Sequence, residues 1–147
     1  MPGSPAKASA PRIPRISEGI AVTAGFEAPQ EGSGALAQIT RGVVHLHAEH
    51  FGRGPTRARS DFIGGDGVIC VLRDTLTAVE LTLVERGRSG EVRALRRAFQ
   101  DAMAPEFRAL VEEAVGRRVV AFLSEMSLAP DIAVDLFFLE PATPGTS

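Results

Sequence analysis

The feature that most constrains the fold of this sequence is a change of hydrophobic period at the segment Gly52-Arg53-Gly54-Pro55. Before it, apolar residues recur every three or four positions, which predicts one face of a helix over 33–51 with Ser33 as its N-cap. The helix is expected to end at this segment, because glycine tolerates positive φ and proline cannot donate a backbone hydrogen bond. A strand is predicted to follow from Thr56 to Ile63. The predicted helix face consists of Leu36, Ile39, Val43, Leu46 and His50.

Turn and capping signals define the next elements. Gly64-Gly65-Asp66-Gly67 predicts a tight turn, and the apolar run 68–72 after it predicts the second strand of an antiparallel hairpin. Thr77-Ala78-Val79-Glu80 fits a capping box and predicts the start of a helix, which Gly87 and Gly90 are expected to interrupt.

A further helical region and two strands are predicted toward the C-terminus. Apolar residues have helical spacing over 92–103, and Pro105 is expected at the first position of another helix that Gly116 ends. The apolar runs 119–123 and 132–139 predict two more strands.

The predicted order is α-β-β-α-α-β-β, which indicates an α+β fold. We expect a two-layer sandwich in which a four-stranded, mainly antiparallel sheet carries the helices on one face. Helix 33–51 with hairpin 56–72 has the layout of helix 105–116 with hairpin 118–139, so an internal duplication is a further hypothesis. An open sheet face or an unpaired strand edge would favour a homodimer.

Composition limits the domain organisation and the class of function. We place one domain at 29–140, between tails at 1–28 and 141–147 that are predicted to be disordered because small and turn-forming residues dominate them. A net charge of −2 argues against a nucleic-acid-binding protein. No apolar run is long enough to span a membrane, and no signal-peptide core is present, so we expect a cytoplasmic protein without direct membrane insertion.

Histidine and cysteine residues are the first candidates for metal binding or catalysis. His47 and His50 are i, i+3 neighbours that a metal can share, whereas His45 lies on another side of the helix. His50 also continues the apolar face, so a structural role is the alternative. Cys70 lies in an apolar strand and is expected to be an inert core residue. We therefore predict no catalytic residue, metal or cofactor, and no enzyme activity.

Arg53, Arg57 and Arg59 are the predicted binding residues. Strand alternation places Arg57 and Arg59 on one face, where Asp61 can pair with Arg59. Guanidinium groups bind phosphate and carboxylate in a bidentate manner, so these arginines predict a small-anion site or a contact with a protein partner. The alternative is a solvated strand face whose charges discourage edge pairing.

Charges of both signs alternate over 80–97, which predicts a solvent-exposed helix surface. A nucleic-acid-binding stripe would need an excess of basic residues. Asp131 and Asp135 are too scattered to suggest a catalytic carboxylate pair. The alternating residues are Glu80, Glu85, Arg86, Arg88, Glu91, Arg93, Arg96 and Arg97.

Four segments carry a resemblance to a known family: 52–59, 76–80, 106–113 and 116–124. In these segments the chain resembles a small bacterial family, first catalogued as a domain of unknown function and now named after the MpsC component of a sodium-translocating, membrane-potential-generating system. That family often has proline where this chain has Ala78, and aromatic residues where this chain has His47 and His50. The resemblance implies association with a sodium- or inorganic-carbon-linked membrane system, and it implies no catalytic residues.

Three hypotheses for function result. The preferred one is a non-enzymatic accessory or regulatory domain, homodimeric, that acts with a membrane transport component. The alternative is a sensor of small anions or nucleotides that uses Arg53, Arg57 and Arg59. The third is a nucleic-acid-binding module, because α-β-β units recur in such modules.

Overall fold

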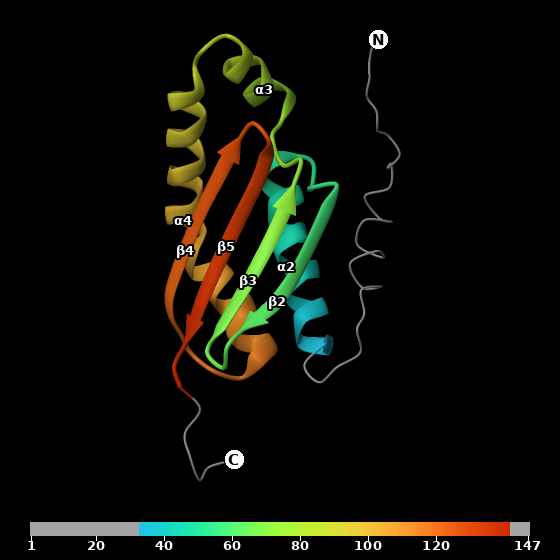
Figure 1. Cartoon of the computed structure of the whole chain (residues 1–147), viewed down its shortest axis with the longest axis vertical. Coiled ribbons are helices and arrows are strands. Elements are labelled where there is room, and N and C mark those ends of the chain that lie inside the picture. Colours follow the sequence, from blue (N-terminus) through green and yellow to red (C-terminus); the bar gives the residue numbers. More distant parts are fainter. Residues whose placement is uncertain (1–32, 142–147) are drawn as a thin grey trace.

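The computed structural model of the chain describes residues 33–141 (Figure 1). The tails predicted for 1–28 and 141–147 lie outside the described residues, apart from Pro141. The element order α-β-β-α-α-β-β confirms the predicted α+β fold. The elements are α2 (Ser33–Phe51), β2 (Arg57–Ile63), β3 (Gly67–Arg73), α3 (Ala78–Glu85), α4 (Ser89–Val115), β4 (Val119–Leu128) and β5 (Asp131–Leu139).

The four strands form one antiparallel sheet in the order β2-β3-β5-β4. Helices α2 and α4 cover one face of it, and α3 lies beyond one end (Figure 1). The two hairpins therefore meet through the central strands β3 and β5. This layout is compatible with a duplicated α-β-β unit, and duplication stays a prediction.

The core lies between the sheet and the two long helices. Inward-facing side chains of the central strands pack against apolar residues of α2 and α4, so the sheet and helices share one hydrophobic layer. Cys70 is buried in this layer, as predicted. The fully buried residues of the core include Ile39, Val43, Val68, Leu72, Phe107, Val111 and Phe137.

The buried face of α2 differs from the predicted one. His47 is only 2 % exposed, whereas His50 lies at the exposed end of the helix and contacts the Phe99 ring at a centroid distance of 5.6 Å. The predicted face was defined mainly by apolar residues, but Thr40 and His47 also point inward and rotate the buried face. The prediction that His50 continues the core face was therefore wrong.

Helix α4 is continuous through Pro105, which was expected to begin a separate helix. Proline removes one backbone hydrogen bond, yet Val92 before it and Phe107 and Val111 after it are all fully buried. Packing on both sides of the proline holds the two halves in one helix. Gly116 ends α4 in the left-handed conformation, with φ of 74°, as predicted.

Strand β4 continues five residues beyond the predicted end at Leu123. The predicted strand ended before the polar residues at 124, 125 and 127. They instead pair with β5, and Ser124 turns inward and donates a hydrogen bond to the buried Asp135.

Candidate functional site

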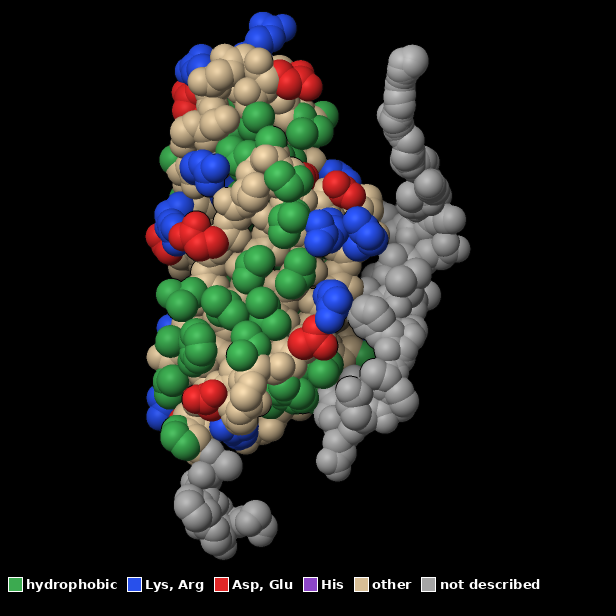
Figure 2. Space-filling view, viewed as in Figure 1, with side chains coloured by type: hydrophobic (Ala, Val, Ile, Leu, Met, Phe, Trp, Pro, Cys, Tyr) green, Lys and Arg blue, Asp and Glu red, His purple; other side chains and the backbone are tan. Residues whose placement is uncertain are grey.

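One face of the sheet is covered by no helix of the described chain, and it is largely apolar. Strand alternation sends every second side chain to this face, opposite α2 and α4. Figure 2 shows hydrophobic side chains gathered along its middle. We call it the open sheet face. Its apolar residues are Ile63, Ile69, Val71, Ala121, Leu123, Ile132, Val134, Leu136 and Phe138.

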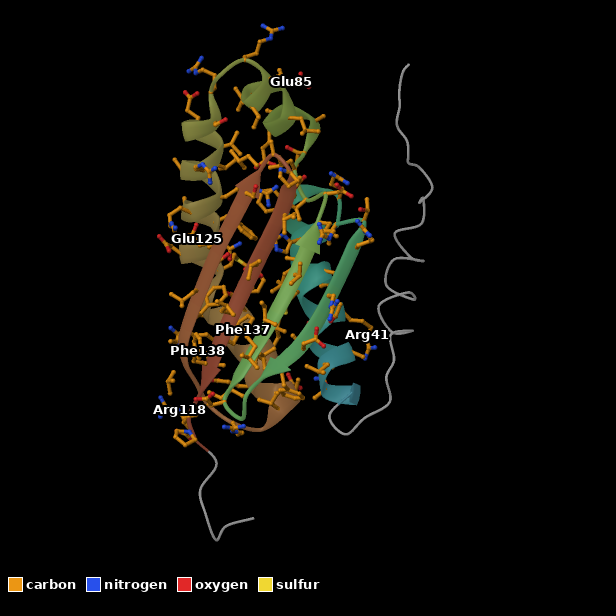
Figure 3. All side chains as sticks on the ribbon, viewed as in Figure 1. Arg41, Glu85, Arg118, Glu125, Phe137 and Phe138 are labelled. Carbon is orange, nitrogen blue, oxygen red and sulfur yellow. The ribbon has the colours of Figure 1, made fainter. Side chains whose placement is uncertain are left out.

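Charged residues border the open sheet face on opposite sides (Figure 2). Arg57, Arg59 and Asp61 project from β2, and Arg73 projects from the adjacent β3. Glu125 lies on the opposite edge strand, β4 (Figure 3). Arg59 donates to Oδ2 of Asp61 from Nε and Nη2, at 3.1 and 2.5 Å, which confirms the pair predicted from strand alternation.

Arg53 has different surroundings from the other two predicted binding residues. It lies in the loop between α2 and β2, where its Nη1 donates to the Leu76 carbonyl at 2.5 Å. Arg57 and Arg59, by contrast, are exposed on the open sheet face. The structure therefore gives Arg53 a contact that ties its loop to the segment before α3.

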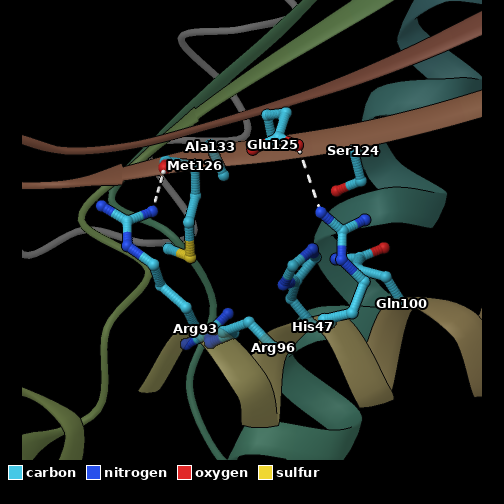
Figure 4. Close-up of a pocket in the computed structure, with 9 residues that line it drawn as sticks. His47, Arg93, Arg96, Gln100, Ser124, Glu125, Met126 and Ala133 are labelled. Carbon is cyan, nitrogen blue, oxygen red and sulfur yellow. Dashed lines mark hydrogen bonds and ion pairs between the residues drawn. The ribbon is translucent and has the colours of Figure 1, made fainter. Parts of the chain in front are cut away.

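A cavity of about 80 Å³ lies between helix α4 and the edge strand β4 (Figure 4). A second one, of about 240 Å³, continues along the same helix. Two arginines of α4 reach across to the strand: Arg93 donates to the Met126 carbonyl at 3.0 Å, and Arg97 donates to the Glu125 carboxylate at 3.1 Å.

Three residues at or next to this cavity have buried polar atoms: His47 and Gln100 line it, and Asp135 is the cross-strand neighbour of Ser124, which also lines it. Both ring nitrogens of His47, Oε1 of Gln100 and Oδ2 of Asp135 have no hydrogen-bond partner among the described residues. Burial raises the pKa of Asp135 to about 6, although a hydrogen bond from Ser124 opposes this shift. Burial and the nearby positive charge of Arg96 lower the pKa of His47 to about 4. Near pH 7 the imidazole is therefore neutral and the carboxyl is mostly ionised.

A buried ion pair joins α3 to α4 beside the cavity. The side chains of Arg96 and Glu80 are 5 % and 2 % exposed, and Arg96 donates to both carboxylate oxygens at 2.6 and 2.7 Å. Arg96 also donates to the Thr75 carbonyl at 2.9 Å and lies 3.9 Å from the centre of the Phe51 ring. Burial raises the pKa of Glu80, but hydrogen bonds from Arg96 and Thr77 outweigh it, so the pKa is lowered.

Sequence reasoning missed these buried charges. The prediction that the charges over 80–97 form a solvated surface was wrong for Glu80 and Arg96. Arg96 follows the buried Val92 by one helical turn, so the helical spacing could have indicated that Arg96 is buried too. Asp135 lies on the same inward phase of β5 as Phe137, so alternation along the strand pointed to its burial.

Each of the two cavities is smaller than the roughly 300–1,000 Å³ that ligand pockets usually occupy. Within residues 33–141, no cluster of three or more His, Cys, Asp or Glu side chains has the arrangement of a metal site. None of the helices in this region combines the length and apolar character of a membrane-spanning segment. The open sheet face is thus the most extensive candidate surface, and its chemistry suits protein binding.

A comparison with family models supports the resemblance seen in the four sequence segments. The model described as Na⁺-translocating membrane potential-generating system (MpsC) matches residues 35–141, nearly all of the region that the structure describes. No significant match was found among curated proteins or among solved structures. On the strength of a match that spans all seven helices and strands, this chain belongs to the MpsC family.

Proposed function

We propose that the chain is a non-enzymatic accessory or regulatory component of a Na⁺-translocating, membrane-potential-generating system. Family membership supports the link with that membrane system. The open sheet face is the observation that supports a binding role, because soluble monomers rarely expose contiguous apolar areas larger than a few hundred Å². The protein would act in the cytoplasm as a homodimer that contacts a membrane transport component, without inserting into the bilayer or binding nucleic acid.

Affinity purification tests the link with the membrane system. The tagged full-length chain is expressed in its native host, membranes are solubilised in mild detergent, and captured proteins are quantified by mass spectrometry. We expect subunits of an ion-translocating membrane complex to be enriched over a capture with an unrelated tagged protein. Deletion of the gene should also lower the membrane potential during growth at high sodium concentration. Capture of no membrane protein, together with an unchanged potential, would refute the proposal.

A small-anion sensor is a second candidate, and one observation favours it. Arg57 and Arg73 are direct cross-strand neighbours, and like charges in that arrangement destabilise a sheet unless an anion lies between them. With Arg59 they form an arginine cluster at one corner of the open sheet face. A thermal-shift screen with phosphate, bicarbonate and nucleotides tests this role. Stabilisation should disappear in the variant Arg57→Ala with Arg73→Ala, and a response that survives both substitutions would exclude this site.

A further inference from the structure

We propose that two copies of the chain pack their open sheet faces together about a two-fold axis that runs parallel to the strands, between β3 and β5. The inference rests on the binding role proposed for this face, and it specifies the occupant and its orientation. A two-fold axis in this direction reverses the strand order of the second copy. Strand β2 of one copy then lies over β4 of the other, and β3 lies over β5.

Charge complementarity supports this orientation. The strand register places Arg59, Val71, Val134 and Glu125 in one row across the sheet. An axis parallel to the strands keeps each row opposite its own copy but reverses the order within it. Arg59 therefore faces Glu125 of the second copy, and Val71 faces Val134. The same contact forms twice, as a two-fold interface requires.

Side-chain size is complementary in another row. Ile63, Gly67, Phe138 and Ala121 are aligned across the sheet by the same register. In the proposed dimer Phe138 lies over Gly67 of the second copy, which has no side chain, and Ile63 lies over Ala121. Large residues thus meet small ones, which is the interdigitation that packed sheet faces need.

A two-fold axis perpendicular to the strands would place β2 over β2 and reverse the order of the rows. Centred on the face, it pairs Arg59 with Asp61 of the second copy, but it leaves Glu125 over the apolar Leu123 and Phe138 over Ile132. Only the parallel axis gives Glu125 an opposite charge and places Phe138 over Gly67, so the two axes predict different effects of charge reversal at Glu125.

The charged residues keep their present partners in this arrangement. Glu125 pairs with Arg97 in its own chain, and Arg59 pairs with Asp61, and all four side chains are about half exposed or more. Exposed pairs contribute roughly 0–1 kcal/mol each, so neither pair holds its residue strongly in place. The dimer would join them into a network in which Arg59 contacts Glu125 of the second copy.

The face is large enough for a weak but specific dimer. Four strands spaced about 4.8 Å apart, with about 7 Å between successive residues on one face, give a flat area of roughly 500 Å² per copy. Two copies would bury roughly 1,000 Å², which is near the lower limit for a specific protein interface. We therefore expect a dimer that dissociates on dilution.

Sedimentation velocity over a range of concentrations tests the dimer with the full-length chain. The wild-type protein should reach twice the 15.5 kDa chain mass at high concentration. Leu136→Arg places a charge in the centre of the open sheet face and should leave a folded monomer. Val79→Arg is the matched control, because Val79 is 69 % exposed and lies on α3, and it should dimerise as the wild type does. A monomeric wild type, or an undiminished dimer in Leu136→Arg, would overturn the proposal.

Charge reversal tests the orientation without an apolar substitution. Arg59→Glu and Glu125→Arg should each weaken dimerisation about tenfold, and the double variant should recover most of the loss. Failure of the double variant to recover would exclude the parallel axis. The membrane-capture experiment is independent of both tests: a monomer that still captures the membrane complex overturns only the dimer, and a dimer that captures nothing overturns only the proposed function.

Discussion

At the scale of single residues, Asp135 makes the stability of this fold depend on pH. Its folded pKa of about 6 lies above the ordinary value of 3.8, so the unfolded chain releases this proton first as the pH rises. The native state therefore loses stability as the pH rises from about 4 to 6, by roughly 3 kcal/mol at most. Asp135→Asn should recover much of this lost stability at pH 7, and the stability difference from the wild type should vanish below pH 4. Urea unfolding across this pH range measures it.

Asp101→Asn is the control for that measurement, because Asp101 is exposed and should change stability little at any pH. His47 contributes in the opposite direction. Its lowered pKa means that the unfolded chain takes up a proton first as the pH falls from 6.5 to 4, so the native state loses stability in that range. This contribution is present in both variants and cancels in the comparison. A stability difference that does not vary with pH would contradict the assignment to Asp135.

Arg96 is expected to be far more important for stability than its neighbour Arg97. Arg96→Ala leaves the Glu80 carboxylate buried without its partner, and losing one member of a buried pair costs about 3–5 kcal/mol. Arg97→Ala removes only an exposed pair with Glu125, which is worth roughly 0–1 kcal/mol. Chemical denaturation followed by circular dichroism measures both. Equal losses for the two arginines would show that the buried pair does not stabilise the fold.

At the scale of elements, replacing glycine by alanine is expected to stabilise the fold at one end of helix α4 and to destabilise it at the other. Gly90 lies in its first turn without positive φ, and a methyl group added there would meet no atom within 4 Å, so Gly90→Ala should stabilise the fold by about 0.4–1 kcal/mol. Gly116 ends the helix at φ of 74°, so Gly116→Ala should destabilise it by about 1 kcal/mol or more. Thermal unfolding of both variants checks the signs. A stabilising Gly116→Ala would mean that α4 does not end in the left-handed conformation.

At the scale of the whole molecule, Cys70 reports global unfolding. It lies on the central strand β3, is 1 % exposed, and burial together with the charge of Asp135 raises its pKa to about 12. Labelling by a thiol reagent should require unfolding of the core and should be at least about a thousand times slower than in the denatured chain. Arg96→Ala should accelerate it in proportion to its loss of stability. Fast labelling of the native wild type would show that the sheet opens locally.

Sequence patterns predicted the elements well where local chemistry sets them. The capping box at Thr77 and Glu80 forms as predicted, with the hydroxyl accepting from the Glu80 backbone and the carboxylate accepting from the Thr77 backbone. The helix end at Gly116 and the hairpin turn before β3 also depend on few neighbouring residues. The prediction that Pro105 begins a new helix was wrong. The residues on both sides of Pro105 pack into the core and keep α4 continuous, and the local sequence does not show this packing.

By itself, the sequence determined the α-β-β-α-α-β-β order, the antiparallel hairpins, the resemblance to the MpsC family and the common face of Arg57 and Arg59, because each depends on residue spacing along one segment. Only the tertiary structure decided that Glu80 meets Arg96, that Asp135 and His47 are buried, and that Arg59 shares a row with Glu125. These relations join segments far apart in the chain. They depend on how the strands pair and on which face of the sheet the helices cover, and the sequence of a single segment determines neither.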